Sequence, residues 1–312
     1  MTKIISLDKN YSTTRCVINE KKFNNENIVN QNDKSKSKLK NILFLPSKKK
    51  RIYEGGLRYK GYFKKSYDDK PLISVITVVF NGEKYLRETI ESVINQTYDN
   101  VEYVIIDGGS TDGTIDIIKS YEDKLDYWIS EPDNGIYDAM NKAIDTVTGK
   151  WVNFINSSDT LNKNAYNKVN DFLVKNSNKC DVFVFGYSIK NNNTMTDYKP
   201  NLNKKWKMPS SHNSIIYKSN IIKEYKFNLN FKYACDFEQI NKIKEVKNIC
   251  KNDFILLTGR DDGFIMQNKF QSILEYFQIC WKNVNKMFAF YWLLRLILEF
   301  FLLRIRKIRR NV

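Results

Sequence analysis

The stretch 101–114, VEYVIIDGGSTDGT, ends a mostly apolar run on the carboxylate of Asp107 and continues with Gly108 and Gly109. Gly-rich turns that follow strands often hold phosphate groups. Here carboxylates stand where a phosphate would be repelled. Asp107 can instead accept hydrogen bonds from a nucleobase N–H or a ribose hydroxyl, and the two glycines allow close approach. We interpret this turn as a site for the uncharged end of a nucleotide.

The elements around this turn alternate between strands and helices. The apolar, β-branched run at 72–81 is typical of a buried parallel strand, and residues 82–97 follow it with apolar positions at helical spacing. Strands are then expected at 101–107, about 126–130 and 151–156, with helices at about 112–122 and 135–147. This order predicts an α/β fold with a mostly parallel sheet, flanking helices and right-handed crossovers.

Ligands of open α/β sheets bind beyond the carboxyl ends of the strands. The four expected strands end on polar or acidic segments at 79–81, 107–109, 130–133 and 156–159. A dinucleotide-binding Rossmann unit does not fit, because it requires G-x-G-x-x-G after the first strand. The first strand here runs into NGEKY, and the second gives G-G-x-x-x-G. The sequence therefore favours another nucleotide-binding α/β fold.

Three segments together resemble the N-terminal half of the family 2 glycosyltransferases: residues 71–114, EPDNGIYDAMNKAI and GKWVNFINSSD. They are most similar to the colanic-acid-type enzymes that build bacterial capsule and exopolysaccharide. The resemblance implies a GT-A fold and an inverting transfer from a nucleotide-diphosphate sugar, with a UDP-sugar as the expected donor. A hexosyl or N-acetylhexosaminyl group would pass to a hydroxyl of a lipid-linked or polysaccharide acceptor.

The resemblance also implies roles for particular positions of this chain. The donor would be bound by Thr77, Val79, Asn81, Glu83, Asp107, Gly108, Asp138, Asn141 and Ser158.

Asp159 is the only acid of NSSD, where the family usually carries a D-x-D-like motif, and it would hold a Mg²⁺ or Mn²⁺ ion that neutralises the leaving diphosphate. Its alternative role is that of a helix N-cap. Asp236 would be the general base, and Glu238 is its competitor. His212 and Trp206 are possible acceptor or phosphate contacts, and Glu238 is a third. A structural His and a Trp at the edge of the core are the alternatives.

The charge distribution points to an anionic surface rather than to nucleic acid. Residues 1–70 carry 18 Lys/Arg and 7 Asp/Glu, and residues 281–312 carry 8 and 1, whereas residues 71–280 carry 25 and 27. A nucleic-acid enzyme would be expected to concentrate its basic residues on the working face. The five cysteines contain no C-x-x-C pair, which predicts a reducing compartment with cysteine as a small apolar residue.

Three regions follow from these patterns. Residues 1–52 are expected to form a basic, weakly ordered extension, 53–270 the GT-A domain, and 271–312 a helical segment that associates with membrane. Arg295 and Glu299 interrupt the C-terminal apolar run, so an amphipathic helix lying on an anionic bilayer is expected rather than a membrane span. The alternative is a helix packed on the protein's own core or on a second copy.

The predicted protein is therefore cytoplasmic and peripheral on the inner face of the cell membrane. Two other functions remain open: a nucleotide-sugar-binding or scaffold protein of the same fold with weak catalysis, and a nucleotidyltransferase. The second would require a basic, Gly-rich loop after the first strand, where FNGEKY offers only Lys84.

Overall fold

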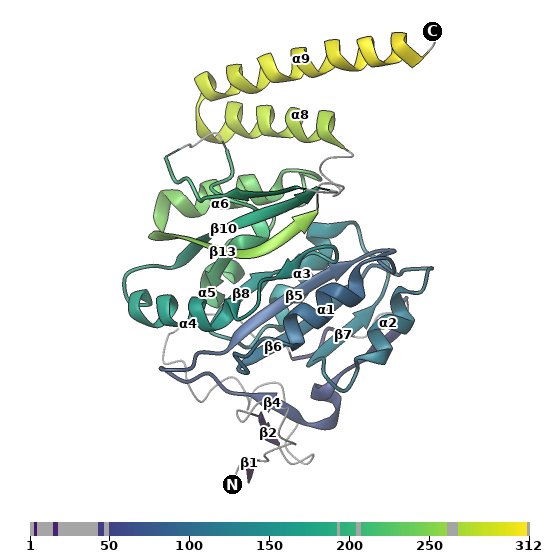
Figure 1. The fold of residues 1–312 in the computed structure, drawn as a ribbon, viewed down its shortest axis with the longest axis vertical. Coiled ribbons are helices and arrows are strands. Elements are labelled where there is room, and N and C mark those ends of the chain that lie inside the picture. The colour runs from purple at the N-terminus through teal and green to yellow at the C-terminus, as the bar shows by residue number, and fades with distance from the viewer. Residues whose placement is uncertain are drawn as a thin grey trace.

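A computed structural model describes residues 3–4, 15–17, 43–46, 50–191, 194–203, 207–260 and 268–310 (Figure 1). The predicted first half is confirmed. Its strands run side by side in parallel in the order β7-β6-β5-β8. Their bounds are β5 (Ile73–Val79), β6 (Val101–Asp107), β7 (Tyr127–Ser130) and β8 (Trp151–Phe154). The helices between them are α1 (Leu86–Ile94), α2 (Thr114–Ser120) and α3 (Ile136–Thr146).

The second half extends the same sheet with mixed strand directions. β12 (Ile215–Lys218) pairs antiparallel with β8, and β10 (Val182–Asn191) lies between β12 and the parallel strand β13 (Ile249–Arg260). The edges are completed by β3 (Tyr53–Gly55), β9 (Thr160–Leu161) and β11 (Thr194–Tyr198). Its helices are α4 (Ala165–Asn176), α5 (Ser219–Glu224) and α6 (Cys235–Val246). The antiparallel pairings of β12 and of the three edge strands make the sheet mostly, not wholly, parallel.

Helices cover both faces of the sheet. Side chains of α1, α2 and α4 form one core cluster with alternate residues of β5, and α3, α5 and α6 form a second cluster with the others. All seven residues of β5 are therefore buried. A strand buried on both faces reads as a continuous apolar run, which is the pattern seen at 72–81.

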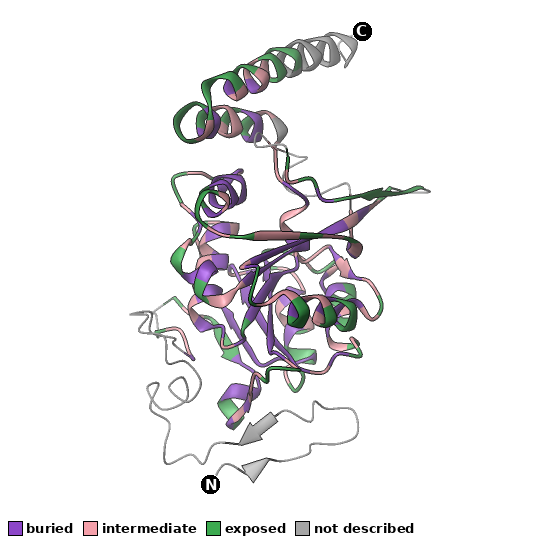
Figure 2. Ribbon diagram, turned by 90° about the vertical axis from the view of Figure 1, so that its left-hand side faces the viewer, coloured by how far each residue is buried: buried purple, intermediate pink, exposed green. Residues whose placement is uncertain are grey.

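A helical hairpin lies beyond the sheet (Figures 1 and 2). α8 (Lys269–Ile279) passes through a π-helical turn, Cys280–Val284, into α9 (Lys286–Arg310). Ala289 and Trp292 of α9 are buried in a third core cluster, which also holds Phe237 of α6 and Ile273 of α8. No helix in the described part of the chain has the length and apolar character needed to cross a bilayer.

The N-terminal region differs from the expected extension at one described segment. Residues 43–46 pack on the domain: Leu43 is buried, its carbonyl accepts a hydrogen bond from the Arg58 guanidinium at 2.8 Å, and Leu45 N–H donates to the Tyr127 hydroxyl at 3.0 Å. The anchor lies in the apolar run ILFL at 42–45, which interrupts an otherwise polar extension. β2 (Arg15–Val17) also pairs with β1 (Lys3–Ile4) and with β4 (Tyr62–Lys64).

The cysteines also differ from expectation. Cys180 and Cys250 form a disulfide, whereas Cys235 and Cys280 are free and buried. The pair is separated by 70 residues. It forms because β13 aligns beside β10, with Cys250 in register with Phe183. A search for closely spaced cysteines misses such a pair.

We expect Leu43→Ala to lower the free energy of unfolding by about 2–5 kcal/mol, the usual cost of truncating a buried leucine. Urea denaturation followed by fluorescence measures this change. Ile52→Ala is the matched control, because Ile52 is 48% exposed and Leu43 only 1%. Equal, small effects of the two substitutions would show that residues 43–46 do not contribute to the folded domain.

Candidate active site

The carboxyl ends of three parallel strands meet at one edge of the sheet. Val79 at the end of β5 is in register with Asp107 of β6, and Asp107 is in register with Ser130 of β7. The polar segments after these strands are thereby brought together, as the sequence predicts. The loop after β8 joins them, since a Cβ added at Gly82 would lie 3.4 Å from the Ser157 hydroxyl.

Asp107 organises its own loop. Its fully buried carboxylate accepts hydrogen bonds from the N–H groups of Gly109 and Ser110, each at 3.0 Å, and from the hydroxyls of Ser110 and Ser130. Gly109 has φ +86°, which favours glycine. With four donors already bound, Asp107 fixes the shape of the turn. A direct contact between this carboxylate and a nucleotide stays a prediction.

Asn81 and Glu83 join the loop after β5 to the loop after β6. The Asn81 side-chain oxygen accepts a hydrogen bond from Thr111 N–H at 2.9 Å, and Glu83 accepts one from Gly113 N–H at 3.1 Å. Asn81 itself has φ +50°, an uncommon conformation for a residue other than glycine. Asp112 bonds the N–H of Thr114, the first residue of α2, at 3.1 Å. The two loops thus form one hydrogen-bonded unit.

Three other predicted donor residues make internal contacts. The Thr77 hydroxyl lies 2.9 Å from the Tyr103 hydroxyl inside the core, and the Val79 side chain belongs to the first core cluster. The Asn141 amide exchanges two hydrogen bonds with the backbone of Phe227, at 2.9 and 3.0 Å. Asn141 therefore ties α3 to the second half of the chain. Their proposed contacts with a donor stay predictions.

The N-terminus of α3 carries two acids at the same edge. Asp138 accepts a hydrogen bond from Asn134 N–H at 3.0 Å, and Asp133 accepts one from Gly135 N–H at 2.7 Å. A Cβ at Gly108 would lie 2.6 Å from the Asp133 carboxylate, so a side chain there would require Asp133 to move. Burial, with the Asp138 and Asp107 carboxylates nearby, raises the pKa of Asp133. Asp133 is not among the residues predicted from the sequence, although it lies in the polar segment after the third strand.

Asp159 lies at the carboxyl end of the β8 segment, between the two halves of the chain. Its carboxylate is bonded by the Asn213 side-chain amide and by Arg260 N–H, yet burial raises its pKa to about 7. No cluster of three His, Cys, Asp or Glu side chains exists in the part of the chain that the structure describes. A carboxylate with two protein donors keeps further lone pairs. Asp159 thus fits a cation held by one protein ligand, with water and ligand oxygens completing the shell.

Asp236 lies in the first turn of α6 and reaches α3. Its Oδ1 accepts hydrogen bonds from the Tyr137 hydroxyl at 3.1 Å and from Phe237 N–H at 2.8 Å. Burial raises the pKa of Asp236 to about 6 despite these bonds. The structure therefore brings the predicted base to the first turn of α3, which also carries Asp138. Tyr137 was missed from the sequence, where an aromatic residue on a core-facing helix carries no sign of a polar role.

The competing acid, Glu238, is engaged elsewhere. Its Oε1 accepts hydrogen bonds from the Lys242 ammonium at 2.6 Å and from the Asn228 amide at 3.2 Å. These contacts favour Asp236 as the base.

His212 lies in an aromatic cluster with ring centroids 5.0 Å from Phe154 and 5.4 Å from Phe227. Burial lowers its pKa to about 3, so the ring is neutral. Neither ring nitrogen bonds a partner within the described ranges. These contacts agree with a structural role, and contact with an acceptor stays a prediction. Trp206 lies outside the described residues.

One residue that the sequence did not reveal holds the loop before Asp236. Glu275 of α8 accepts three backbone hydrogen bonds, from Lys232 at 2.8 Å, Tyr233 at 2.7 Å and Ala234 at 2.9 Å. Converging N–H groups of this kind favour a negative charge strongly. α8 thereby fixes the entry into α6, although 40 residues separate the partners in sequence.

Comparison with known families and structures agrees with this geometry. The family model described as Glycosyl transferase family 2 matches residues 74–237. A putative teichuronic acid biosynthesis glycosyltransferase, TuaG of Bacillus subtilis, is 38% identical over 124 residues, which cover 38% of this chain and 48% of that protein. An uncharacterized glycosyltransferase of Rickettsia typhi is 29% identical over 231 residues, covering 69% of this chain and 72% of the relative. The chain thus spans about half the length of the first of these relatives.

Two solved structures have similar folds. TarS 1-349 of S. aureus in complex with UDP-GlcNAc has a TM-score of 0.55 at 20% identity, covering 72% of this chain and 71% of that chain. The mannosyltransferase PcManGT of Pyrobaculum calidifontis, in complex with GDP-Man and Mn²⁺, has a TM-score of 0.53 at 17% identity, covering 67% and 64%. These likenesses show the fold, which is the predicted GT-A fold.

Removing the Glu275 carboxylate should loosen the start of α6. In Glu275→Ala, the amides of residues 232–234 lose a charged acceptor that is worth about 1.5–3 kcal/mol per hydrogen bond, so their hydrogen exchange should accelerate about tenfold or more. Exchange measured by mass spectrometry or NMR tests this. Glu245→Ala, on the exposed side of α6, is the control and should leave these amides unchanged. Unchanged protection in Glu275→Ala would contradict the assigned contacts.

Proposed function

Because this chain belongs to glycosyl transferase family 2, we propose that it is an inverting glycosyltransferase of cell-surface polysaccharide biosynthesis. It would move a hexosyl or N-acetylhexosaminyl group from a UDP-sugar to a hydroxyl of a lipid-linked or polysaccharide acceptor. The observation that carries the proposal is the buried Asp236 carboxylate, which is held at the N-terminus of α3 beside the polar edge of the parallel sheet.

The chemistry requires one base. The acceptor oxygen attacks the anomeric carbon, the bond from that carbon to the diphosphate oxygen breaks, and the acceptor proton passes to the base. Tyr137 and Phe237 N–H both bond Oδ1 of Asp236, which leaves Oδ2 to take the proton. A carboxylate with a raised pKa accepts a proton more readily than an exposed one.

A divalent cation fits this proposal at Asp159. The ion would stabilise the negative charge that develops on the leaving diphosphate. Asn213 and Arg260 N–H would orient the carboxylate from the second half of the chain. The fold relative PcManGT is described with GDP-Man and Mn²⁺, which supports the choice of Mg²⁺ or Mn²⁺.

The pathway and the donor are inferred from relatives. TuaG is named for teichuronic acid biosynthesis, and TarS is described with UDP and with UDP-GlcNAc. We therefore favour a UDP-sugar and a cell-surface polysaccharide, with capsule or exopolysaccharide of the colanic-acid type as the specific case. A release assay for UDP, with and without Mn²⁺, separates this function from a catalytically weak scaffold and from a nucleotidyltransferase.

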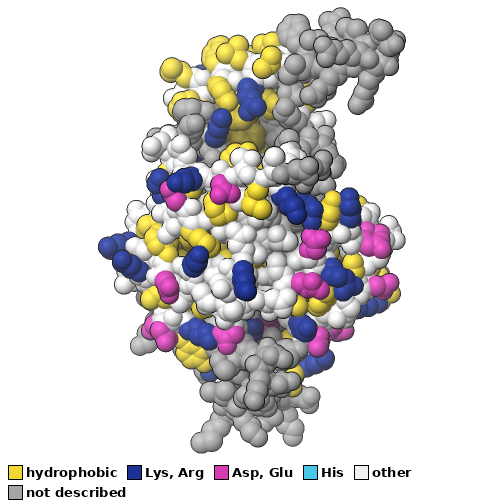
Figure 3. All heavy atoms as spheres, in the orientation of Figure 1, with side chains coloured by type: hydrophobic (Ala, Val, Ile, Leu, Met, Phe, Trp, Pro, Cys, Tyr) yellow, Lys and Arg dark blue, Asp and Glu magenta, His cyan; other side chains and the backbone are white. Residues whose placement is uncertain are grey.

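We also propose that α9 places the enzyme on the inner face of the cell membrane. One side of the helix packs on the protein through Ala289 and Trp292, and the other exposes an apolar stripe (Figures 2 and 3). The members of this stripe recur at helical spacing and are Met287, Phe290, Leu294, Ile297 and Leu298. The sequence continues with five basic residues in 304–310, which suit anionic lipid. A bilayer explains both features, whereas a second copy of the chain explains only the stripe.

Asp236→Asn should lower the turnover number by roughly 10²–10⁴-fold, the range for a general base, while the affinity for UDP measured by calorimetry stays the same. Because the base must be deprotonated and burial raises its pKa to about 6, the wild-type rate should rise with pH through about 6 and level off above it. Glu238→Gln is the matched acid control. If Glu238→Gln is inactive and Asp236→Asn is active, the base is wrongly assigned.

Phe290→Glu combined with Leu294→Glu should weaken binding to vesicles of phosphatidylcholine and phosphatidylglycerol at least about tenfold, because each buried side chain contributes about 1.5–3 kcal/mol. Sedimentation with vesicles measures the binding. Leu229→Glu, which alters an exposed leucine elsewhere, should have no effect. Undiminished vesicle binding, or a change from dimer to monomer in sedimentation velocity, would assign the stripe to another role.

A further inference from the structure

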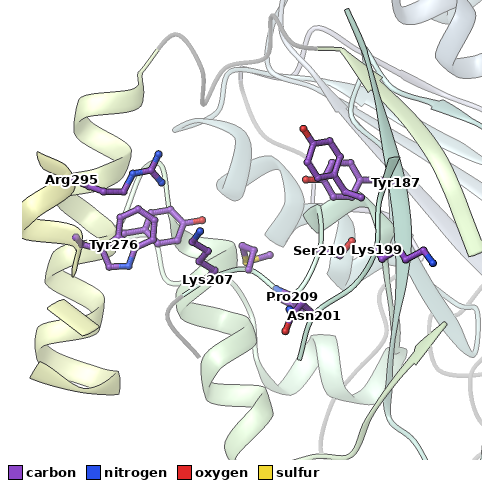
Figure 4. A pocket seen from close by; sticks show the side chains of 11 residues that line it. Tyr187, Lys199, Asn201, Lys207, Pro209, Ser210, Tyr276 and Arg295 are labelled. Atoms are coloured by element: carbon purple, nitrogen blue, oxygen red, sulfur yellow. The ribbon is translucent and has the colours of Figure 1, made fainter. Parts of the chain in front are cut away.

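A pocket of about 430 Å³ lies between the β10–β11 pair and the α8–α9 hairpin (Figure 4). Tyr187 and Tyr198 form one wall, and Tyr276 and Trp292 contribute to the wall opposite. Residues 207–210 line it between these walls. The function proposed above does not use this pocket.

The walls present flat aromatic surfaces. The Tyr187 and Tyr198 rings are stacked with centroids 5.0 Å apart, and the Tyr276 and Trp292 rings lie 4.5 Å apart. Aromatic faces of this kind bury the apolar C–H faces of a sugar. The Ser210 hydroxyl and Asn201 side chain add polar groups to the lining. The walls suit a ligand that is both apolar-faced and polar at its edges.

Two cations reach the pocket from different elements. Figure 4 shows the Arg295 guanidinium directed into it from α9 and the Lys207 ammonium rising beside Tyr276. Lys199 points away, and its ammonium pairs with Asp253 at 3.5 Å. No Asp or Glu is among the described lining residues. Lysine and arginine without a facing carboxylate favour an anion, and arginine in particular binds phosphate oxygens in a bidentate manner.

The pocket also lies between the proposed base and the proposed membrane surface. The Tyr276 ring packs 4.4 Å from that of Phe237, the neighbour of Asp236. On the other side, Arg295 directly follows Leu294 of the exposed apolar stripe. A ligand with its phosphate at Arg295 can therefore direct an alkyl chain toward the bilayer and its sugar toward α6.

We propose that this pocket binds the phosphate-bearing end of a lipid-linked acceptor, with the phosphate between Lys207 and Arg295. The proposal rests on the glycosyltransferase function inferred above and names the acceptor class for that function. A soluble anionic glycan would bind the same cations, but it has no apolar part that would contact the adjacent stripe.

Calorimetry with the full chain and geranyl diphosphate, a short prenyl diphosphate, tests the pocket without vesicles. The wild type should bind this probe, and the double variant Lys207→Gln, Arg295→Gln should bind it at least about tenfold more weakly, because a charged hydrogen bond contributes about 1.5–3 kcal/mol. Lys199→Gln is the control with an unchanged affinity. Equal binding by the wild type and the double variant would overturn the site.

Two further measurements separate the possible failures. Inorganic diphosphate that binds as tightly as geranyl diphosphate would overturn the lipid-linked assignment in favour of a soluble anion.

Affinity for UDP is measured in the same variants and should not change, because the edge of the sheet that is proposed to bind the donor lies on other elements. Loss of UDP binding in the double variant would place the donor diphosphate in this pocket and overturn the proposal. A wild type that binds geranyl diphosphate but never releases UDP from a panel of UDP-sugars would instead count against the glycosyltransferase function alone, and the pocket would stand.

Discussion

Three consecutive backbone N–H groups, of residues 232–234, converge on the carboxylate of Glu275, and Asp236 begins the next turn of the chain. The opposite side of this turn is held by the Tyr137 hydroxyl on Asp236 Oδ1. Residues from α8 and α3 thus fix the start of α6 from two directions. Without these contacts the Asp236 carboxylate would have no defined position relative to the polar edge of the sheet, since α6 itself follows a loop.

This arrangement makes the C-terminal hairpin part of the site's framework. The rings of Phe237, Tyr276 and Trp292 pack in sequence, at 4.4 and 4.5 Å, and so link α6 through α8 to α9. Because close-packed rings resist compression, a shift of one ring also shifts its neighbour. If α9 lies on a bilayer as proposed, the height of Asp236 above the lipid is set by this stack, and an acceptor that stays in the membrane meets the base at a fixed depth.

The sequence predicts the first half of the fold well because its signals are local. The β-branched run of β5 and the helical spacing in α1 depend on neighbours a few residues away. The second half depends on distant partners: β10 and β13 pair across about 70 residues and bring Cys180 to Cys250. Glu275 and Tyr137 were missed for the same reason, because a glutamate on a helix and a tyrosine among apolar residues acquire their roles only from chain segments 40 to 100 residues away.

For the site residues, too, local sequence signals predict some features and contacts with other chain segments decide the rest. The polar strand ends do converge as predicted, but convergence does not decide which side chains remain available for a ligand. The Asp107 carboxylate accepts four hydrogen bonds from neighbouring groups, and the Asn141 amide bonds the backbone of Phe227. Both therefore have structural roles, and their contacts with a donor stay predictions. At Asp159 and Asp236, burial raises the pKa of the carboxylate although protein donors oppose that rise.

A buried carboxylate with a raised pKa is stabilised when a cation or a proton binds to it. The proposed sugar transfer needs one carboxylate for each: one that binds a cation and one that takes the acceptor proton. The two acids come from different halves of the chain, and each is held by contacts with the opposite half: Asp159 by Asn213, Asp236 by Tyr137. The pairing of β8 with β12, which joins the two halves of the sheet, therefore brings both acids into position. A variant that weakens the pairing of β8 with β12 should affect Asp159 and Asp236 together, whereas the loops after β5 and β6, which are bonded to one another and to Ser130 of β7, keep their shape.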